Sequence, residues 1–111
     1  MTKEEKAKKE INRLNRIYKV LPKNQYTVLK KIIIEAAWLE VTLEELRETI
    51  DAYGIEEEYQ NGQNQLGIKE TVASKTFANY TKLYQAYIKI LNENIPPETR
   101  AKGKLDTFLN D

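Results

Sequence analysis

Apolar residues recur every three or four positions over long stretches of this chain, as they do along the buried face of an α-helix. The first long row comprises Leu29, Ile32, Ala36, Leu39, Leu43, Leu46, Ile50 and Tyr53. The second comprises Phe77, Tyr80, Tyr84, Tyr87 and Leu91. The two rows predict two long antiparallel helices, over about residues 24–53 and 71–94, that pack against each other.

A shorter row precedes them, at Ile11, Leu14, Tyr18 and Leu21. It predicts a first helix over about residues 3–20, which a capping box of Thr2 and Glu5 opens and Pro22 ends. The opposite face of this helix is basic and presents Lys6, Lys9, Arg13 and Arg16. The first helix therefore has one face to bury and another that attracts anions.

Residues 42–45 read as a second capping box, which would break the long helix into a helix-turn-helix. Two observations oppose a break: the apolar row continues through Thr42 without a change of phase, and the second helix would be acidic, so that DNA phosphates would repel it. We predict one continuous helix of about 30 residues, ~45 Å long, with Asn24 as its N-cap and Gly54 at its end.

The segment after Gly54 predicts a β-hairpin, because Asn61-Gly62 is a strong signal for a two-residue turn. Such a turn would pair Gln60 with Gln63 and Ile55 with Ile68. This register gathers four apolar side chains on one face of the hairpin: Ile55, Tyr59, Leu66 and Ile68. Since an isolated two-stranded hairpin is marginally stable, we expect it to pack on a helix or on a second subunit.

Pro96-Pro97 ends the last helix. We therefore expect one mainly α domain over residues 1–95, with the hairpin at about 55–68, and a flexible polar tail over residues 96–111. The tail holds one apolar island, Leu105, Phe108 and Leu109. The island is either a segment that docks on a partner or part of an inert tail.

Charge is strongly segregated, although the net charge of the whole chain is only +1. Residues 1–31 carry ten Lys and Arg against three Asp and Glu, whereas residues 32–70 carry two against ten. Such polarity indicates either a basic end that meets an anionic partner or complementary ends that meet in an oligomer.

The composition removes most catalytic chemistry. The chain has no cysteine and no histidine, so disulfides, thiol nucleophiles and Ser-His or Cys-His dyads are excluded. It also has no glycine-rich phosphate loop, which leaves carboxylate or lysine chemistry. We therefore predict a protein that is not an enzyme and uses no metal or cofactor. With no signal peptide and no apolar run long enough to span a membrane, we expect it in the cytoplasm.

The order of a helix, a long helix, the hairpin and a second long helix resembles the short terminase small subunits of tailed bacteriophages. The matching residues are Ala36-Ala37-Trp38, Leu46, residues 54–67 and residues 95–100, and the resemblance covers about residues 24–102. The chain departs from the family pattern twice. Residues 68–72 stand where an Asn-Pro step is common, and only a proline and Arg100 remain of a Leu-Gly-Leu-Thr-Pro run before the terminal arginine.

The resemblance implies a non-catalytic protein that works in the cytoplasm of a bacterial host. Such proteins bind double-stranded viral DNA near the start site of packaging, assemble as homo-oligomeric rings, and pass the DNA to the large subunit, which holds the ATPase and the nuclease. The alternative is a helical-hairpin structural or adaptor protein, such as a connector-type phage component, that does not bind DNA.

Three sets of residues are candidates for these roles. The basic face, Lys6, Lys9, Arg13 and Arg16, would contact DNA phosphates without reading sequence, or is simply solvated. An oligomer interface would use Ile34, Trp38, Val41, Tyr59 and Leu66, although Trp38 and its neighbours could cover the first helix instead. Docking to the large subunit would use Leu105, Phe108 and Leu109.

Two other rows have simpler explanations. Lys75, Lys82 and Lys89 are expected to be solvated or paired with acidic residues of the neighbouring helix. The tyrosines of the last helix are expected to pack in the core rather than to stack on bases.

Overall fold

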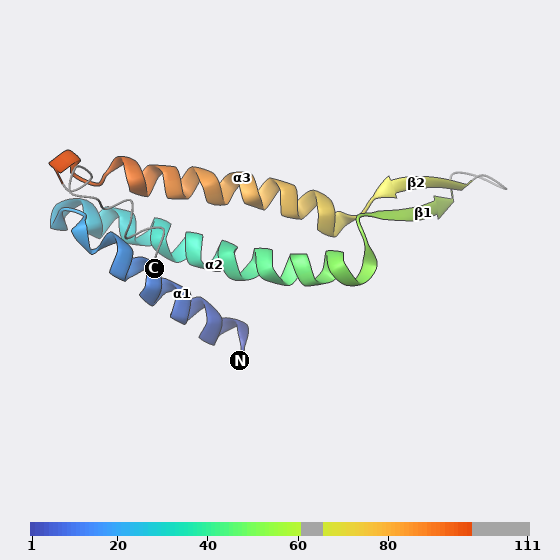
Figure 1. The fold of residues 1–111 in the computed structure, drawn as a ribbon, viewed down its shortest axis with the longest axis horizontal. Coiled ribbons are helices and arrows are strands. Elements are labelled where there is room, and N and C mark those ends of the chain that lie inside the picture. Colours follow the sequence, from blue (N-terminus) through green and yellow to red (C-terminus); the bar gives the residue numbers. More distant parts are fainter. Residues whose placement is uncertain (61–65, 99–111) are drawn as a thin grey trace.

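Three α-helices and a two-stranded antiparallel sheet form the part of the protein, residues 1–60 and 66–98, that this computed structural model describes (Figure 1). The helices are α1 (Lys3–Ile17), α2 (Lys23–Tyr53) and α3 (Val72–Glu93), and the strands are β1 (Glu56–Gln60) and β2 (Leu66–Glu70). A 3-10 turn, Tyr18–Val20, follows α1. The prediction of a mainly α protein is confirmed.

α2 is the central element, and it runs through Thr42 without a break. It begins at Lys23, and its N-cap is Pro22, two residues before the predicted N-cap Asn24. The carbonyl of Pro22 accepts hydrogen bonds from the backbone N–H groups of Gln25 and Tyr26, at 3.0 and 2.8 Å. Gly54 ends the helix with a φ of 83°, a conformation that favours glycine.

Side-chain caps start the other two helices. The Thr2 hydroxyl accepts a hydrogen bond from the backbone N–H of Glu5 at 3.1 Å and donates one to its carboxylate at 3.2 Å. The Thr71 hydroxyl likewise accepts from the backbone N–H of Ser74, at 3.2 Å. Both caps satisfy backbone donors that the first helical turn leaves unpaired.

The core lies where all three helices meet, at one end of the molecule. α2 and α3 lie side by side and run in opposite directions, and α1 crosses them at an angle (Figure 1). The buried residues of this core are Leu14, Ile17, Tyr18, Leu21, Leu29, Ile33, Ala36, Ala37, Leu91 and Ile95. The Tyr18 hydroxyl donates a hydrogen bond of 2.7 Å to the Asn92 side-chain oxygen, which joins the end of α1 to the end of α3.

The register of the hairpin differs from the prediction. Glu58 pairs with Ile68 and Gln60 with Leu66, so five residues connect the strands and the Asn61-Gly62 turn lies outside the described residues. Ile68 was predicted to pair with Ile55 and pairs instead with Glu58, a shift of three residues. Because successive side chains of a strand point to opposite faces, an odd shift changes which side chains share a face. The predicted apolar face is therefore wrong, because Ile55 and Ile68 lie on opposite faces of the hairpin.

Along its described residues the hairpin does not pack on a helix, and the other support that we expected, a second subunit, stays a prediction. The hairpin projects from the far end of the α2–α3 pair, and the molecule is elongated, with extents of 64 × 29 × 26 Å (Figure 1). Ile55 and Ile68 are 56% and 67% exposed. The backbone N–H of Thr71 donates to the carbonyl of Ile55 at 2.9 Å, which holds the base of the hairpin closed.

Candidate nucleic-acid interface

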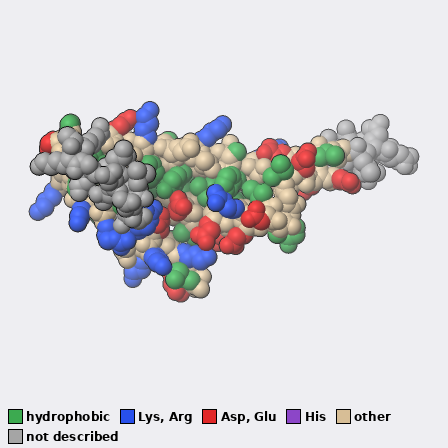
Figure 2. All heavy atoms as spheres, in the orientation of Figure 1, with side chains coloured by type: hydrophobic (Ala, Val, Ile, Leu, Met, Phe, Trp, Pro, Cys, Tyr) green, Lys and Arg blue, Asp and Glu red, His purple; other side chains and the backbone are tan. Residues whose placement is uncertain are grey.

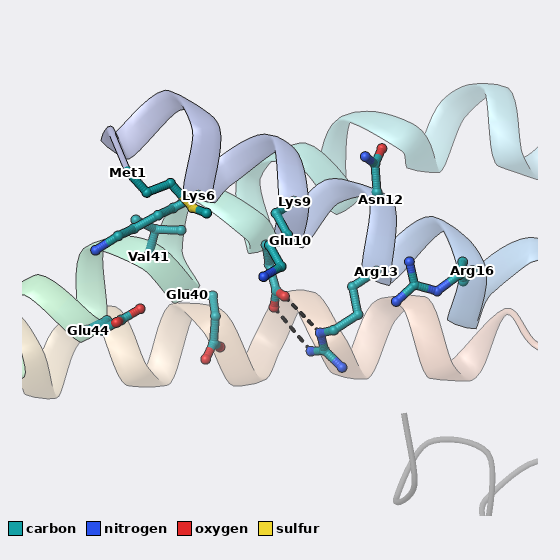
Figure 3. A pocket seen from close by; sticks show the side chains of 10 residues that line it. All are labelled: Met1, Lys6, Lys9, Glu10, Asn12, Arg13, Arg16, Glu40, Val41 and Glu44. Atoms are coloured by element: carbon teal, nitrogen blue, oxygen red, sulfur yellow. Dashed lines mark hydrogen bonds and ion pairs between the residues drawn. The ribbon is translucent and has the colours of Figure 1, made fainter.

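A cleft of about 630 Å³ runs along α1, and all four residues of the predicted basic face line it (Figure 3). Their neighbours in the cleft are Met1, Glu10, Asn12, Glu40, Val41 and Glu44. The cleft therefore combines a cationic wall from α1 with carboxylates from α1 and α2.

The packing of α1 decides how far each cation reaches solvent. Leu14 and Ile17 are buried against α2 and α3, so the rest of the helix is fixed in orientation. Lys9 and Arg16 are exposed, but Lys6 and Arg13 are half-buried at the sides of the apolar stripe. The prediction that these four residues form the face opposite the core is therefore wrong for Lys6 and Arg13.

Arg13 is engaged inside the protein. Its Nε donates to one carboxylate oxygen of Glu10 at 2.7 Å, and its Nη2 donates to the other at 3.1 Å. The two residues, three positions apart on α1, form a bidentate ion pair. Its positive charge also lowers the pKa of Tyr18 and of Tyr84, although burial outweighs it for both hydroxyls. Arg13 thus belongs to the junction of the three helices rather than to the outer face of α1.

The two tyrosines at this junction remain neutral over a wide pH range. Burial raises the pKa of Tyr18 from 10.0 to about 12. Burial also raises the pKa of Tyr84, and the negative charge of Glu40 and a hydrogen bond to its carboxylate raise it further. Tyr84 therefore links the acidic side of the cleft to α3.

Two exposed cations near the predicted set are absent from it. Lys8 of α1 and Lys19 of the 3-10 turn that follows are exposed, as are Lys9 and Arg16. The sequence could have identified Lys8 and Lys19. On a helical projection of 100° per residue, both lie at a larger angle from the buried Leu14 than Lys6 does. The exposed surface of α1 is consequently basic after its acidic first turn, which carries Glu4 and Glu5.

Polar contacts hold the start of α1 on α2. The ammonium of Lys3 lies 3.0 Å from the carboxylate of Glu45 and 4.6 Å from the centre of the Trp38 ring. The Trp38 ring in turn lies 6.1 Å from that of Tyr80 on α3. Trp38 thus contributes to the packing within the chain while 41% of its surface stays exposed.

The predicted oligomer interface is divided by the structure. Ile34 is 46% exposed, like Trp38 beside it, but Val41 is 3% exposed and lines the cleft beside α1. Val41 therefore packs beside α1 and is too buried to form part of the predicted oligomer interface. Tyr59 and Leu66 lie in the two strands, but their side chains fall outside the described residues.

The other predicted residues are those of the apolar island in the tail and the lysines and tyrosines of α3. Leu105, Phe108 and Leu109 lie outside the described residues. Lys75, Lys82 and Lys89 are exposed, and Lys89 has a contact of 4.0 Å with Glu93 of its own helix rather than with α2. The tyrosines at 80, 84 and 87 are half-buried on α3, and the last two pack against the core cluster.

Opposite charges occupy different parts of the visible surface. Lys and Arg side chains gather over α1, and Asp and Glu side chains lie along the distal half of α2 and the hairpin (Figure 2). Within residues 1–60 and 66–98, no helix is long and apolar enough to cross a membrane. Comparison with protein-family models, curated proteins and solved structures finds no match to this chain.

Proposed function

We propose that this protein is a terminase small subunit of a tailed bacteriophage, a non-catalytic component that binds double-stranded viral DNA. In this role it forms a homo-oligomeric ring and recruits or regulates the large ATPase-nuclease subunit during genome packaging. The resemblance at Ala36-Ala37-Trp38 and at residues 54–67 supports the assignment.

The observation that carries the DNA-binding part is the basic outer surface of α1. The exposed cations of α1 are Lys8, Lys9 and Arg16, and Lys19 follows them in the 3-10 turn. A helix fixed by its other face can lie along a phosphate backbone with these side chains, and contacts of this kind position a protein without reading sequence. Arg13, predicted as a fourth contact, is instead held in an ion pair with Glu10 of the same helix.

The oligomer and the docking segment are parts of the same proposal. Ile34 and Trp38 form an exposed apolar pair on α2 that fits a contact with a second copy, together with the strand residues Tyr59 and Leu66. The tail residues Leu105, Phe108 and Leu109 are proposed to dock on the large subunit.

A paired charge removal tests the DNA contact. The variant Lys9→Gln/Arg16→Gln should bind duplex DNA about tenfold more weakly at low salt, and its plot of log affinity against log salt should lose a slope of about 1 for each lost phosphate contact. Gel shifts over a salt titration measure both quantities.

The matched control is Lys75→Gln/Lys82→Gln, which removes the same charge from exposed positions of α3. Its affinity should stay within about twofold of the wild type. Equal losses in the two variants would mean that net charge alone governs binding, and unchanged binding by the α1 variant would refute the proposed site.

A second candidate function is a structural or adaptor protein that does not bind DNA. The exposed Ile34 and Trp38 and the projecting hairpin favour it, because both offer surface to protein partners. The same salt titration separates the two functions, since only a DNA-binding protein gives affinity that falls steeply as salt increases.

A further inference from the structure

The wall of the cleft that faces the lysines of α1 is acidic (Figure 3). Glu40 and Glu44 of α2 line the same cleft as Lys6 and Lys9. We propose that Glu40 and Glu44 compete with DNA phosphate for these two lysines and so reduce the affinity of α1 for anions. This inference rests on the proposed function and identifies two residues that weaken DNA binding by α1.

The position of the two carboxylates follows from the packing of Val41. Val41 is buried beside α1, which turns its neighbour Glu40, and Glu44 one turn further along α2, toward the cleft. Glu40 lies close enough to Tyr84 of α3 for its negative charge to raise the pKa of that hydroxyl. The next residue after Glu44, Glu45, forms the ion pair with Lys3, so α2 already binds one lysine of α1 directly.

The competition is local. Charges on a protein surface act over about 8 Å at physiological salt. Glu40 and Glu44 share a cleft with Lys6 and Lys9, and they therefore repel a phosphate that approaches these lysines. The carboxylates of Glu56 and Glu58 are on the hairpin at the far end of the molecule, too distant to act in the same way (Figure 1).

The arrangement distinguishes a long polyanion from a small anion. A single phosphate that enters the cleft gains Lys6 and Lys9 but meets the two carboxylates of α2, Glu40 and Glu44. A DNA duplex carries a charge about every 1.7 Å along its axis and can engage Lys8 and Lys19, which do not line the cleft. Glu40 and Glu44 thus make binding depend on the outer face of α1.

The test uses the full chain, a short double-stranded DNA duplex and fluorescence anisotropy over a salt titration. The variant Glu40→Gln/Glu44→Gln should bind the duplex about three- to tenfold more tightly than the wild type at low salt, and the gain should shrink as salt rises. The control Glu56→Gln/Glu58→Gln makes the same change in net charge and should stay within about twofold of the wild type.

Glu44→Gln alone is a second variant, because Glu40 also contacts Tyr84 and its replacement affects packing. It should retain a gain in affinity with an unchanged circular dichroism spectrum. If the cleft and hairpin variants gain equally, or neither gains while the wild type binds DNA, the competition is refuted and the proposed function stands. If neither the wild type nor any variant binds DNA, the proposed function fails as well.

Discussion

At the scale of single residues, a few polar side chains at the junction of the three helices determine how the helices fit together. Tyr18 is 1% exposed and still satisfies its hydroxyl, through the hydrogen bond to Asn92. Arg13 and Glu10 form a forked pair beside it. A buried polar group is tolerated only where it has such a partner, so the bond between Tyr18 and Asn92 helps to fix the end of α1 on α3.

Tyr18 makes the stability depend on pH in the alkaline range. Its pKa is raised to about 12 in the fold, so unfolded chains lose this proton near pH 10 while folded ones keep it. The contribution is therefore fully present below about pH 10 and falls as the pH rises toward about 12, by about 3 kcal/mol in total. Thermal unfolding between about pH 9 and pH 12 measures the loss, from below the pKa of the unfolded chain up to that of the folded one.

The variant Tyr18→Phe is the control for this effect. It should be about 1 kcal/mol less stable at neutral pH, because the hydrogen bond to Asn92 is lost, and it should show a shallower decline above pH 10. A decline as steep as that of the wild type would assign the alkaline loss to other groups.

Leu91 tests the packing of the core. Its side chain is fully buried in the cluster that α1, α2 and α3 share, and Leu91→Ala should lower the free energy of unfolding by about 3 kcal/mol. Leu83→Ala on the same helix is the matched control, because Leu83 is 40% exposed and should cost less than about 1 kcal/mol. Similar losses in urea unfolding would show that α3 does not pack by the face described.

At the scale of elements, the sequence predicts the helices far better than the hairpin. The three-four spacing that passes Thr42 without interruption is a property of the whole of α2, and the continuous helix follows from it. The turn signal at Asn61-Gly62 is local, and it predicts a register that the structure does not have. The ladder is instead anchored at its base, where the Thr71 N–H bonds the Ile55 carbonyl.

The candidate site was predictable in part. Periodicity identifies α1 as an amphipathic basic helix, but it cannot tell which cations a neighbouring carboxylate will hold. The pairing of Arg13 with Glu10 depends on the rotamers that the core allows. Periodicity also cannot say whether Val41 meets α1 or a second subunit, because both arrangements need the same apolar row; the docking of α1 decides it.

At the scale of the whole molecule, ion pairs within one chain account for part of the segregation of charge. The sequence left open an anionic partner or complementary ends that meet in an oligomer. The ion pair between Lys3 and Glu45 shows that basic and acidic segments already meet within one chain. A contact of the exposed cations of α1 with a polyanion stays a prediction.

Lysine reactivity measured with and without duplex DNA tests the central claim most directly. The full-length protein is acetylated under limiting conditions in low salt, and mass spectrometry gives the modification of each lysine. Binding through α1 predicts that DNA protects Lys8, Lys9 and Lys19, while Lys75 and Lys82 of α3 react as they do in the free protein. Unchanged reactivity of the α1 lysines in the presence of bound DNA, or protection confined to α3, would contradict the account.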